Sequence, residues 1–459
     1  EIMSSDWSSD VCSSDLAPSN IGNMSGYNPQ ERGFNEEHRK LEIEEVKKAI
    51  DFASDVTKGG SVVVHTGEYL RDMTYAPWNK KMDDGDYEFL SYEEEPERQV
   101  LYMVDDRTGK LISEVRKSQV IREPKFKTKR DPNQGNRERW IDKDGNFLNE
   151  TNPEDLFKRV PEWESEGTKF TSERLTWEDF ERRAEEWNKW NPRTQKDPMT
   201  GEEKVVPWKP EEIFFKSQMD TRILQARGSS LYHGRFFEPN MEAKEKLKEA
   251  LKFYKEIEGR MDPEDQWKLF QKDQKLGRFA GIGYQFIQED QKLPSELRQG
   301  AINDIDVELK YIHEASAAAD AQADESYETL MHVKPIERYA EDQTSKSYAE
   351  AGIYAMDQTK EKKVPDPIFV APENIFPEMG YGSHPDELIT LVKDARKRMV
   401  EYLTKPYIPD PKGSWENPEN PDDPPVRKKI KNPYFRGMDQ KQAEKMAEWI
   451  KHSSFIQFT

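Results

Sequence analysis

The sequence predicts a parallel α/β fold that a large α+β insertion interrupts. Two short apolar runs, residues 61–65 and 367–371, are rich in β-branched and aromatic residues and have the length of buried parallel strands. A helical pattern precedes each run, as expected where helices and strands alternate. Each run also leads to a residue that can bind a metal, His65 in the first case and Glu373 in the second.

The first helix–strand unit follows residues 17–36, a loop-like segment rich in Asn, Gly, Ser and Pro. Residues 37–56 are expected to be helical, because their apolar positions fall near helical spacing. These positions are Leu41, Ile43, Val46, Ile50 and Phe52. Two glycines, Gly59 and Gly60, then end the helix, and the first strand begins at once.

Residues 75–299 form the predicted insertion, of the kind that loops at the strand ends of a barrel tolerate. A β-hairpin is expected from 99–104 and 111–115, since a turn containing glycine separates the two runs. Residues 122–139 are basic and are expected to form a loop. Helices are predicted at 175–190, 241–258 and 263–272.

The helix–strand alternation returns in residues 300–459. Helical patterns cover 297–323, 347–360, 385–403 and 439–451. The second strand lies between the second and third of these helices, and 405–433 is expected to be a loop because it is rich in Pro, Asp and Asn. We therefore predict that residues 17–74 and 300–459 form one parallel α/β domain around the insertion.

The two ends of the chain carry their own expectations. Residues 1–16 contain a Ser/Asp repeat with the character of translated sequencing-adapter read-through from a metagenomic gene, so we set them aside and expect them to be disordered. They hold the only cysteine, Cys12. The chain also stops after the last predicted helix, where another strand is expected, so we expect a fragment that is truncated at both ends.

Composition limits the compartment and the partners. The formal net charge of −20 disfavours non-specific binding to nucleic acid. A single cysteine fits a reducing cytoplasm and excludes a disulfide scaffold. No apolar stretch approaches the roughly 20 residues that a membrane helix needs. We therefore predict a cytoplasmic protein without a membrane partner and leave its oligomeric state open.

The ends of the two strands supply the candidate site. Thr66 and Gly67 let the backbone turn sharply after His65, so that the imidazole can point across the end of the sheet. A carboxylate at Glu373, after an apolar strand, must be paired, hydrogen-bonded or metal-bound if it is buried. Because the carboxyl ends of parallel strands meet at one edge, both residues can serve one metal. Glu68 is the candidate acid or base. The alternatives are an ordinary loop histidine and solvated glutamates.

Two segments resemble one known superfamily. Residues 42–69, with the motif GGSVVVHTGEY, resemble the third α/β unit of the xylose isomerase-like TIM barrels, which include sugar isomerases, epimerases and endonuclease IV-type enzymes. The stretch PIFVAPENIFPEMGYGSHPDELITLV resembles the next unit. The resemblance implies an incomplete TIM (β/α) barrel in which His65 and Glu373 bind a catalytic divalent metal (Zn, Mn or Mg). Asn374 and His384 are the polar residues that we expect to support these ligands.

The resemblance implies a metal-dependent enzyme of the sugar isomerase or epimerase type, with a small sugar or sugar phosphate as its ligand. An abasic-site endonuclease of the endonuclease IV type is the first alternative, and a non-catalytic scaffold or interaction protein is the second. The acidic composition favours a sugar over nucleic acid. Thr66 stands where the endonuclease pattern has Pro, and the later Asp and His ligands have no counterpart. The assignment as an enzyme therefore stays open, and we expect this chain itself to be inactive.

Overall fold

The computed structural model describes residues 14–16, 21, 23–67, 69, 71, 76, 78–80, 82–85, 87–88, 100–150, 152–163, 171–196, 203–276, 293–373, 382, 384–410, 415–416 and 426–451. These residues form a mixed α/β structure, as predicted. Contacts divide the chain into two compact units, one made of Glu1–Lys216 with Met331–Thr459 and the other of Ser217–Leu330. The predicted boundaries at residues 74 and 300 stay predictions.

A parallel sheet of three strands lies in the first unit. Its order is β1 (Ser14–Leu16), β4 (Gly60–His65) and β14 (Ile368–Glu373). Strands β4 and β14 are parallel neighbours, which confirms the predicted pairing of two segments far apart in sequence. On the other side of β14, Val370 forms a parallel bridge with Ile450. Within the described residues the sheet does not close into a barrel, so the TIM barrel stays a prediction.

Strand β1 differs from the sequence-based expectation. We expected residues 1–16 to be disordered, but Ser14–Leu16 pair in parallel with residues 61–63 of β4. The physical reason is that the edge of β4 presents unpaired N–H and C=O groups, which any extended segment can satisfy. Residues 1–13 lie outside the described residues.

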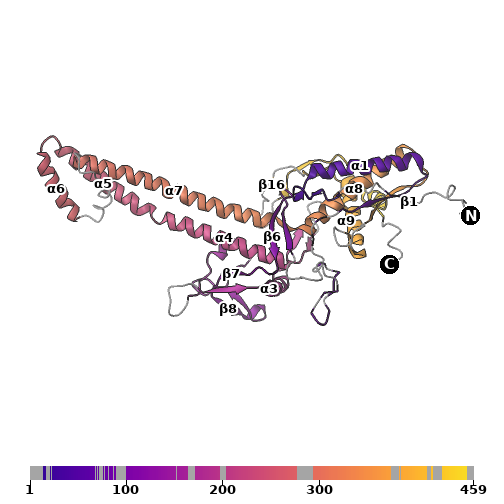
Figure 1. Ribbon diagram of the computed structural model, residues 1–459, viewed down its shortest axis with the longest axis horizontal. Coiled ribbons are helices and arrows are strands. Elements are labelled where there is room, and N and C mark those ends of the chain that lie inside the picture. Colours follow the sequence, from indigo (N-terminus) through magenta and orange to yellow (C-terminus); the bar gives the residue numbers. More distant parts are fainter. Residues whose placement is uncertain are drawn as a thin grey trace, which may run out of the picture. The chain divides into compact units, whose positions relative to one another are not determined.

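Four helices accompany the sheet: α1 (Glu36–Val56), α8 (Ile336–Glu361), α9 (Pro385–Thr404) and α10 (Gln440–Ala447). Figure 1 shows α1, α8 and α9 gathered in one region of the first unit. Asn35 begins α1, because its side chain accepts hydrogen bonds from the backbone of Glu37 and His38. Helix α8 begins before the predicted residue 347. Thr344 and Ser345, ahead of that position, are buried, and Lys346 pairs with Glu36 of α1.

One face of the sheet packs on these helices. Val62, Val64 and Val370 belong to the same buried cluster as apolar residues of α1, α8 and α9. Val63 and Ala371 are also buried but lie outside this cluster. Because side chains alternate between the two faces of a strand, residues 63 and 65 of β4 and residues 371 and 373 of β14 share the other face. The strand pattern thus sets the direction of the two candidate ligands.

The hairpin predicted in the insertion is confirmed. Strands β5 (Val100–Asp105) and β6 (Leu111–Arg116) are antiparallel, and β13 (Val333–Pro335) pairs with the other edge of β5. Helix α3 (Trp177–Trp190) is also confirmed, with a capping box at Thr176.

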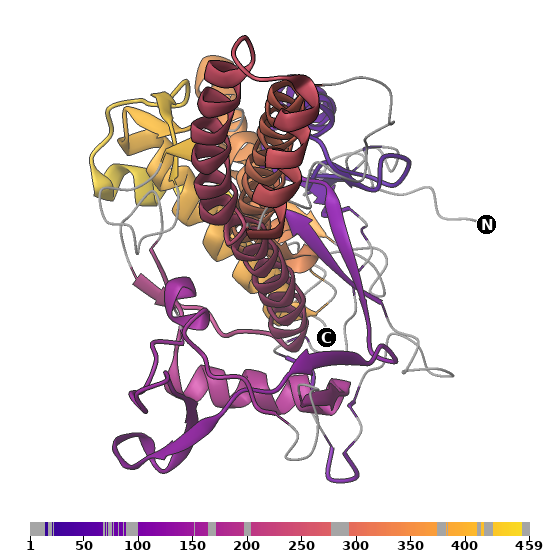
Figure 2. The same ribbon diagram turned by 90° about the vertical axis from the view of Figure 1, so that its left-hand side faces the viewer.

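The basic segment 122–139 is not a loop, contrary to the prediction. It contributes to β7 (Ile121–Pro124), β8 (Thr128–Asp131) and β9 (Arg137–Trp140). Strand β7 pairs with β10 (Ser172–Leu175), and β8 pairs with β9, in two antiparallel ribbons. The loop was inferred from charge, but a two-stranded ribbon exposes much of its surface, so charged residues can occupy it throughout. Figure 2 shows these purple strands close to the magenta helix α3.

Short elements also occupy the other expected loops. Residues 17–36 contain the paired strands β2 (Tyr27–Asn28) and β3 (Gly33–Phe34). Residues 405–433 contain β15 (Tyr407–Pro409), β16 (Trp415–Glu416), β17 (Val426–Arg427) and β18 (Lys429–Lys431). The remaining elements of the first unit are α2 (Pro153–Leu156), η2 (Pro132–Gln134), β11 (Thr194–Lys196) and β12 (Glu203–Val205).

The second unit is helical. It contains most of α4 (Pro210–Gly234) and α7 (Pro294–His332), together with α5 (Phe237–Ile257) and α6 (Pro263–Leu276). Contacts of Ser230 with Ser316 and of Lys244 with Asp306 show that α4 and α5 run antiparallel to α7. No helix among the described residues is long and apolar enough to cross a membrane.

Candidate functional site

The two candidate ligands lie side by side. The register of the sheet aligns His65 of β4 with Glu373 of β14. The imidazole Nε2 lies 3.7 Å from the carboxylate Oε2, so the predicted proximity of the two side chains is confirmed. Both side chains are mostly buried, with exposed fractions of 14% and 23%. Their role as metal ligands stays a prediction.

The Nε2 atom of His65 has no hydrogen-bond partner among the described residues, although it is buried. Its separation from the carboxylate of Glu373 is too long for a hydrogen bond. A buried polar atom without a partner costs free energy, so among the described residues Nε2 remains available to a further group. A group that accepts the lone pair of the imidazole and contacts the carboxylate would complete it.

The backbone around the pair is fixed by buried hydrogen bonds. The N–H of Thr66 donates to the carbonyl oxygen of Glu373 at 2.8 Å, which joins the two strand ends. The hydroxyl of Tyr348, from α8, donates to the carbonyl oxygen of Val64 at 2.6 Å. Burial, with the charge of Glu373 adding to it, raises the pKa of Tyr348 well above its ordinary value. The phenol therefore stays protonated and keeps donating to β4.

The segment that follows β4 packs closely on its surroundings. Gly67 has a φ of +88°, and a Cβ built there would lie 2.5 Å from Oδ1 of Asn23. Gly382, in the segment that precedes α9, has a φ of +94°, and its Cβ would lie 2.7 Å from Leu388 and 3.4 Å from Thr66. Residues beyond β4 and residues ahead of α9 therefore meet beside the candidate site, and glycine permits the close approach.

A buried ion pair joins the same two segments. Arg71 donates two hydrogen bonds to the carboxylate of Glu387, at 2.7 and 3.1 Å, and the indole of Trp78 donates a third at 2.6 Å. Burial alone would raise the pKa of Glu387, but Arg71, Trp78 and the N–H of Gly382 together lower it. The fork geometry holds the first turn of α9 against the segment after β4.

The remaining predicted site residues are placed differently. Glu68 and Asn374 lie outside the described residues, so their roles stay predictions. The ring of His384 stacks on Trp78 with centroids 4.6 Å apart, and its Nδ1 accepts a hydrogen bond from the N–H of Asp386 at 3.2 Å. These contacts make His384 the N-cap of α9. None of the contacts described for His384 involves His65 or Glu373, so its predicted support of a metal ligand stays a prediction.

His65 and Glu373 have the chemistry of metal ligands, but they are fewer than a protein metal site ordinarily provides. Imidazole nitrogen and carboxylate oxygen are ligands that Zn²⁺ and Mn²⁺ accept, and the orphaned Nε2 is available for such a bond. A protein site ordinarily provides three or more ligands. In the described part of the chain no group of three His, Cys, Asp or Glu side chains is arranged to hold an ion. His65 and Glu373 would therefore supply two positions of a coordination shell.

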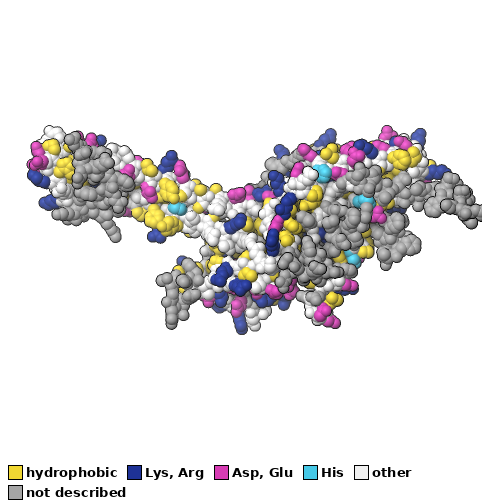
Figure 3. Space-filling model, viewed as in Figure 1, with side chains coloured by type: hydrophobic (Ala, Val, Ile, Leu, Met, Phe, Trp, Pro, Cys, Tyr) yellow, Lys and Arg dark blue, Asp and Glu magenta, His cyan; other side chains and the backbone are white. Residues whose placement is uncertain are grey.

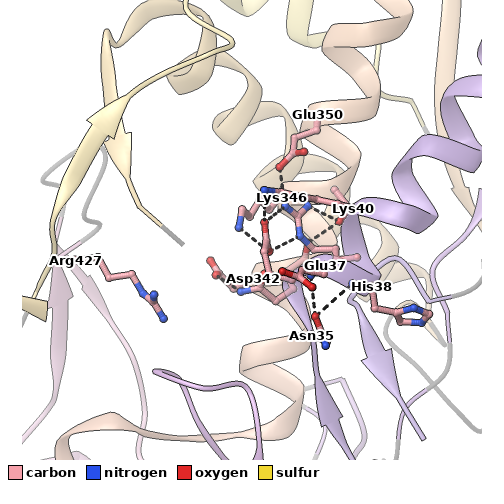
Figure 4. A network of polar contacts seen from close by, with 12 residues as sticks. Asn35, Glu37, His38, Lys40, Asp342, Lys346, Glu350 and Arg427 are labelled. Atoms are coloured by element: carbon pink, nitrogen blue, oxygen red, sulfur yellow. Dashed lines mark hydrogen bonds and ion pairs between the residues drawn. The ribbon is translucent and has the colours of Figure 1, made fainter. Parts of the chain in front are cut away.

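A second polar cluster lies between α1 and α8 (Figure 4). Arg39, with 1% of its side chain exposed, donates to Glu36, Glu350 and Ser347 at 2.7–2.9 Å. Lys346 pairs with Glu36 at 3.2 Å, and burial, assisted by the nearby Arg39, lowers the pKa of Lys346 to about 8. Perturbed groups of this kind can mark active sites, but here each charge has a partner. We interpret the cluster as structural.

Sequence reasoning missed three residues beside the site, namely Tyr348, Arg71 and Glu387. Tyr348 lies within α8, and no pattern in the helix sequence indicates that its hydroxyl reaches the end of β4. The partners Arg71 and Glu387 are separated by 316 positions, and no local spacing connects them. The one available signal was the pair of acidic residues, Asp386 and Glu387, in the first turn of α9.

Searches with this chain matched no protein-family model, no curated protein and no solved structure.

Proposed function

We propose that the chain belongs to a divalent-metal-dependent enzyme of the xylose isomerase-like TIM barrel type, acting as a sugar isomerase or epimerase. The observation that carries the proposal is the placement of His65 and Glu373 at aligned positions of two parallel strands, with Nε2 and Oε2 3.7 Å apart. Chemistry in β/α barrels is located at the carboxyl ends of the strands, which is where both residues lie.

The arrangement of the sheet supports the same proposal. Strand β4 follows α1, and β14 is followed by α9, α10 and the bridge at Ile450. The pairing of β4 with β14 and the bridge are both parallel. The helices pack against one face of β4 and β14, and the two candidate ligands lie on the other. In a β/α barrel the helices form the outer layer, so this other face would be the barrel interior.

In this proposal neutral His65 offers the lone pair of Nε2 and Glu373 offers a carboxylate oxygen to one Mn²⁺, Zn²⁺ or Mg²⁺. The bound metal would polarise a hydroxyl and carbonyl pair of a sugar or sugar phosphate as a Lewis acid. The hydrogen bond from Thr66 to the backbone of Glu373 would hold the two ligands in register. Glu68 is the proposed acid or base.

Paramagnetic broadening tests the site. The chain has seven histidines, whose ring signals can be followed by NMR while Mn²⁺ is added. We expect the His65 signal to broaden at a small fraction of an equivalent of Mn²⁺, while the exposed His313 of α7 does not respond. Glu373→Gln should abolish the selective broadening, and Glu308→Gln, on the exposed face of α7, should preserve it. Uniform broadening, or broadening that survives Glu373→Gln, would show that the site is wrongly placed.

Ligand addition separates the three candidate functions. A sugar phosphate that shifts the His65 signal in the Mg²⁺-loaded protein supports the isomerase or epimerase proposal. A response to an abasic duplex instead supports the endonuclease alternative. Absence of any metal response at His65 supports the scaffold alternative. Since the described residues supply two metal ligands, we expect weak metal binding and little turnover by this chain alone.

A further inference from the structure

The ribbon of β7 and β10 brings like charges together on both of its faces. Its register places Arg122 opposite Arg174 and, one residue along, Glu123 opposite Glu173. Directly opposite side chains in an antiparallel pair lie about 5 Å apart at Cβ, and like charges at such positions are destabilising. Each pair therefore needs a compensating charge.

One of the two pairs is compensated within the chain. Arg183 of α3 donates to Glu123 at 2.8 Å and to Glu173 at 2.7 Å. The guanidinium fork thus bridges the two carboxylates on the face of the ribbon toward α3. The register of two acidic residues is tolerated because a cation lies between them.

For the arginine pair, the described residues provide no corresponding anion. Arg122 and Arg174 are both exposed, alternating with the glutamates along their strands, and neither makes an ion pair or a side-chain hydrogen bond with any described residue. Two guanidinium groups side by side provide the planar donor forks that match the oxygens of a phosphate. By the logic of the glutamate pair, an anion is the partner that the described residues do not supply.

Further cations extend this surface along the chain. Lys127 and Arg130 are exposed, and they also make no ion pair among the described residues. Residues 116–139 hold nine Lys and Arg against three Asp and Glu, a net charge of +6 in a chain of −20. Dark blue side chains lie over β7 and β8 in Figure 3. We name Arg122, Arg174, Lys127 and Arg130 the basic ribbon surface.

We propose that the basic ribbon surface binds the phosphate backbone of a nucleic acid. Four exposed cations, in two ribbons and the segment that joins them, suit a repeating phosphodiester better than a single small anion. Trp163, with 53% of its area exposed, follows Glu162, whose N–H donates to the carbonyl oxygen of Lys125 between the cations. Aromatic residues interleaved with cations favour nucleic acid, because bases can stack on them. The surface lies in the insertion and does not depend on the proposed metal chemistry.

Fluorescence anisotropy tests the proposal with labelled duplex DNA, single-stranded DNA and RNA of one sequence, at 50 to 200 mM salt. Four backbone contacts predict a slope of log affinity against log salt of about −3.6 on duplex DNA. The double variant Arg122→Gln/Arg174→Gln should lose about tenfold or more in affinity at 50 mM salt and halve the slope to about −1.8. The three nucleic acids identify the preferred source of the phosphates.

A matched control removes the same charge elsewhere. Arg222→Gln/Arg260→Gln replaces two exposed arginines of the second unit and should leave affinity and slope within about twofold of the parent protein. Equal losses in both double variants, or no binding by the parent at 50 mM salt, would overturn the proposal. So would binding to vesicles of phosphatidylserine without binding to any oligonucleotide. The variants touch neither His65 nor Glu373, so failure here leaves the metal proposal standing.

Discussion

Replacing Arg39 by methionine should destabilise the first unit strongly. The side chain of Arg39 is 1% exposed. Its removal leaves the carboxylates of Glu36 and Glu350, which are 16% and 7% exposed, without their shared cation. Removing one partner of a buried ion pair costs about 3–5 kcal/mol. Glu36 keeps Lys346 at 3.2 Å and Glu350 keeps the hydroxyl of Tyr434 at 2.8 Å, so we expect the lower end of that range, about 3 kcal/mol.

The assay is urea unfolding at pH 7 followed by far-ultraviolet circular dichroism. Lys40→Met is the matched control, because Lys40 is the next residue of α1, is 56% exposed and lies 3.9 Å from Glu36. Its cost should stay within about 0.5 kcal/mol. Adding Glu350→Gln to Arg39→Met should recover part of the loss, since no buried charge is then left at that position. An Arg39→Met cost within about 1 kcal/mol of the control would refute the reasoning.

Three further predictions concern single positions. Gly67→Ala should cost about 2 kcal/mol or more in thermal unfolding, because a φ of +88° is combined with a steric overlap at the added Cβ. Gly85→Ala is the control and should cost about 1 kcal/mol, because Gly85 has a φ of +95° but lies in open space. Equal costs for the two variants would contradict the overlap at Gly67. Burial lowers the pKa of Lys346 in the folded protein from 10.5 to about 8. At a pH between these two pKa values the unfolded state binds more protons than the folded state, so stability should rise with pH by up to about 3 kcal/mol. Lys346→Met should flatten that rise, and an identical profile in the variant would count against it. Arg183→Gln should lower the free energy of unfolding by about 1–2 kcal/mol at low salt, because without Arg183 the opposed Glu123 and Glu173 repel each other. The cost should be smaller in 1 M NaCl, which screens this repulsion. A cost independent of salt would disprove the bridging role of Arg183.

The sequence allowed the pairing of β4 with β14 to be predicted for a physical reason. Both runs were apolar throughout and both followed a helix, so a parallel sheet was the arrangement in which each could be buried. The adjacency of His65 and Glu373 then followed, because the carboxyl ends of parallel strands lie at one edge. The identity of an ion and the closure of a barrel do not follow from two strands, and both stay predictions.

Three elements, namely α4, β7 and β8, could not be predicted, and the burial of their residues explains why. Residues 211–215 of α4 are all buried, including two glutamates, so the start of this helix has no exposed face and lacks the periodicity that marks an amphipathic helix. Strands β7 and β8 show the opposite pattern, since most of their residues are charged and at least partly exposed. The Arg71–Glu387 pair was hidden for a third reason, because its partners are distant in sequence and meet only through the fold.

Strand register connects the two proposed sites. Pairing between strands forces His65 beside Glu373 and Arg122 beside Arg174, as it forces Glu123 beside Glu173. The glutamate pair shows how the chain compensates such a contact when the contact serves stability, with one guanidinium between two carboxylates. In the other two pairs the described residues supply no such group. Our two proposals place a metal ion beside the first pair and a phosphate beside the second, and each would supply the missing group.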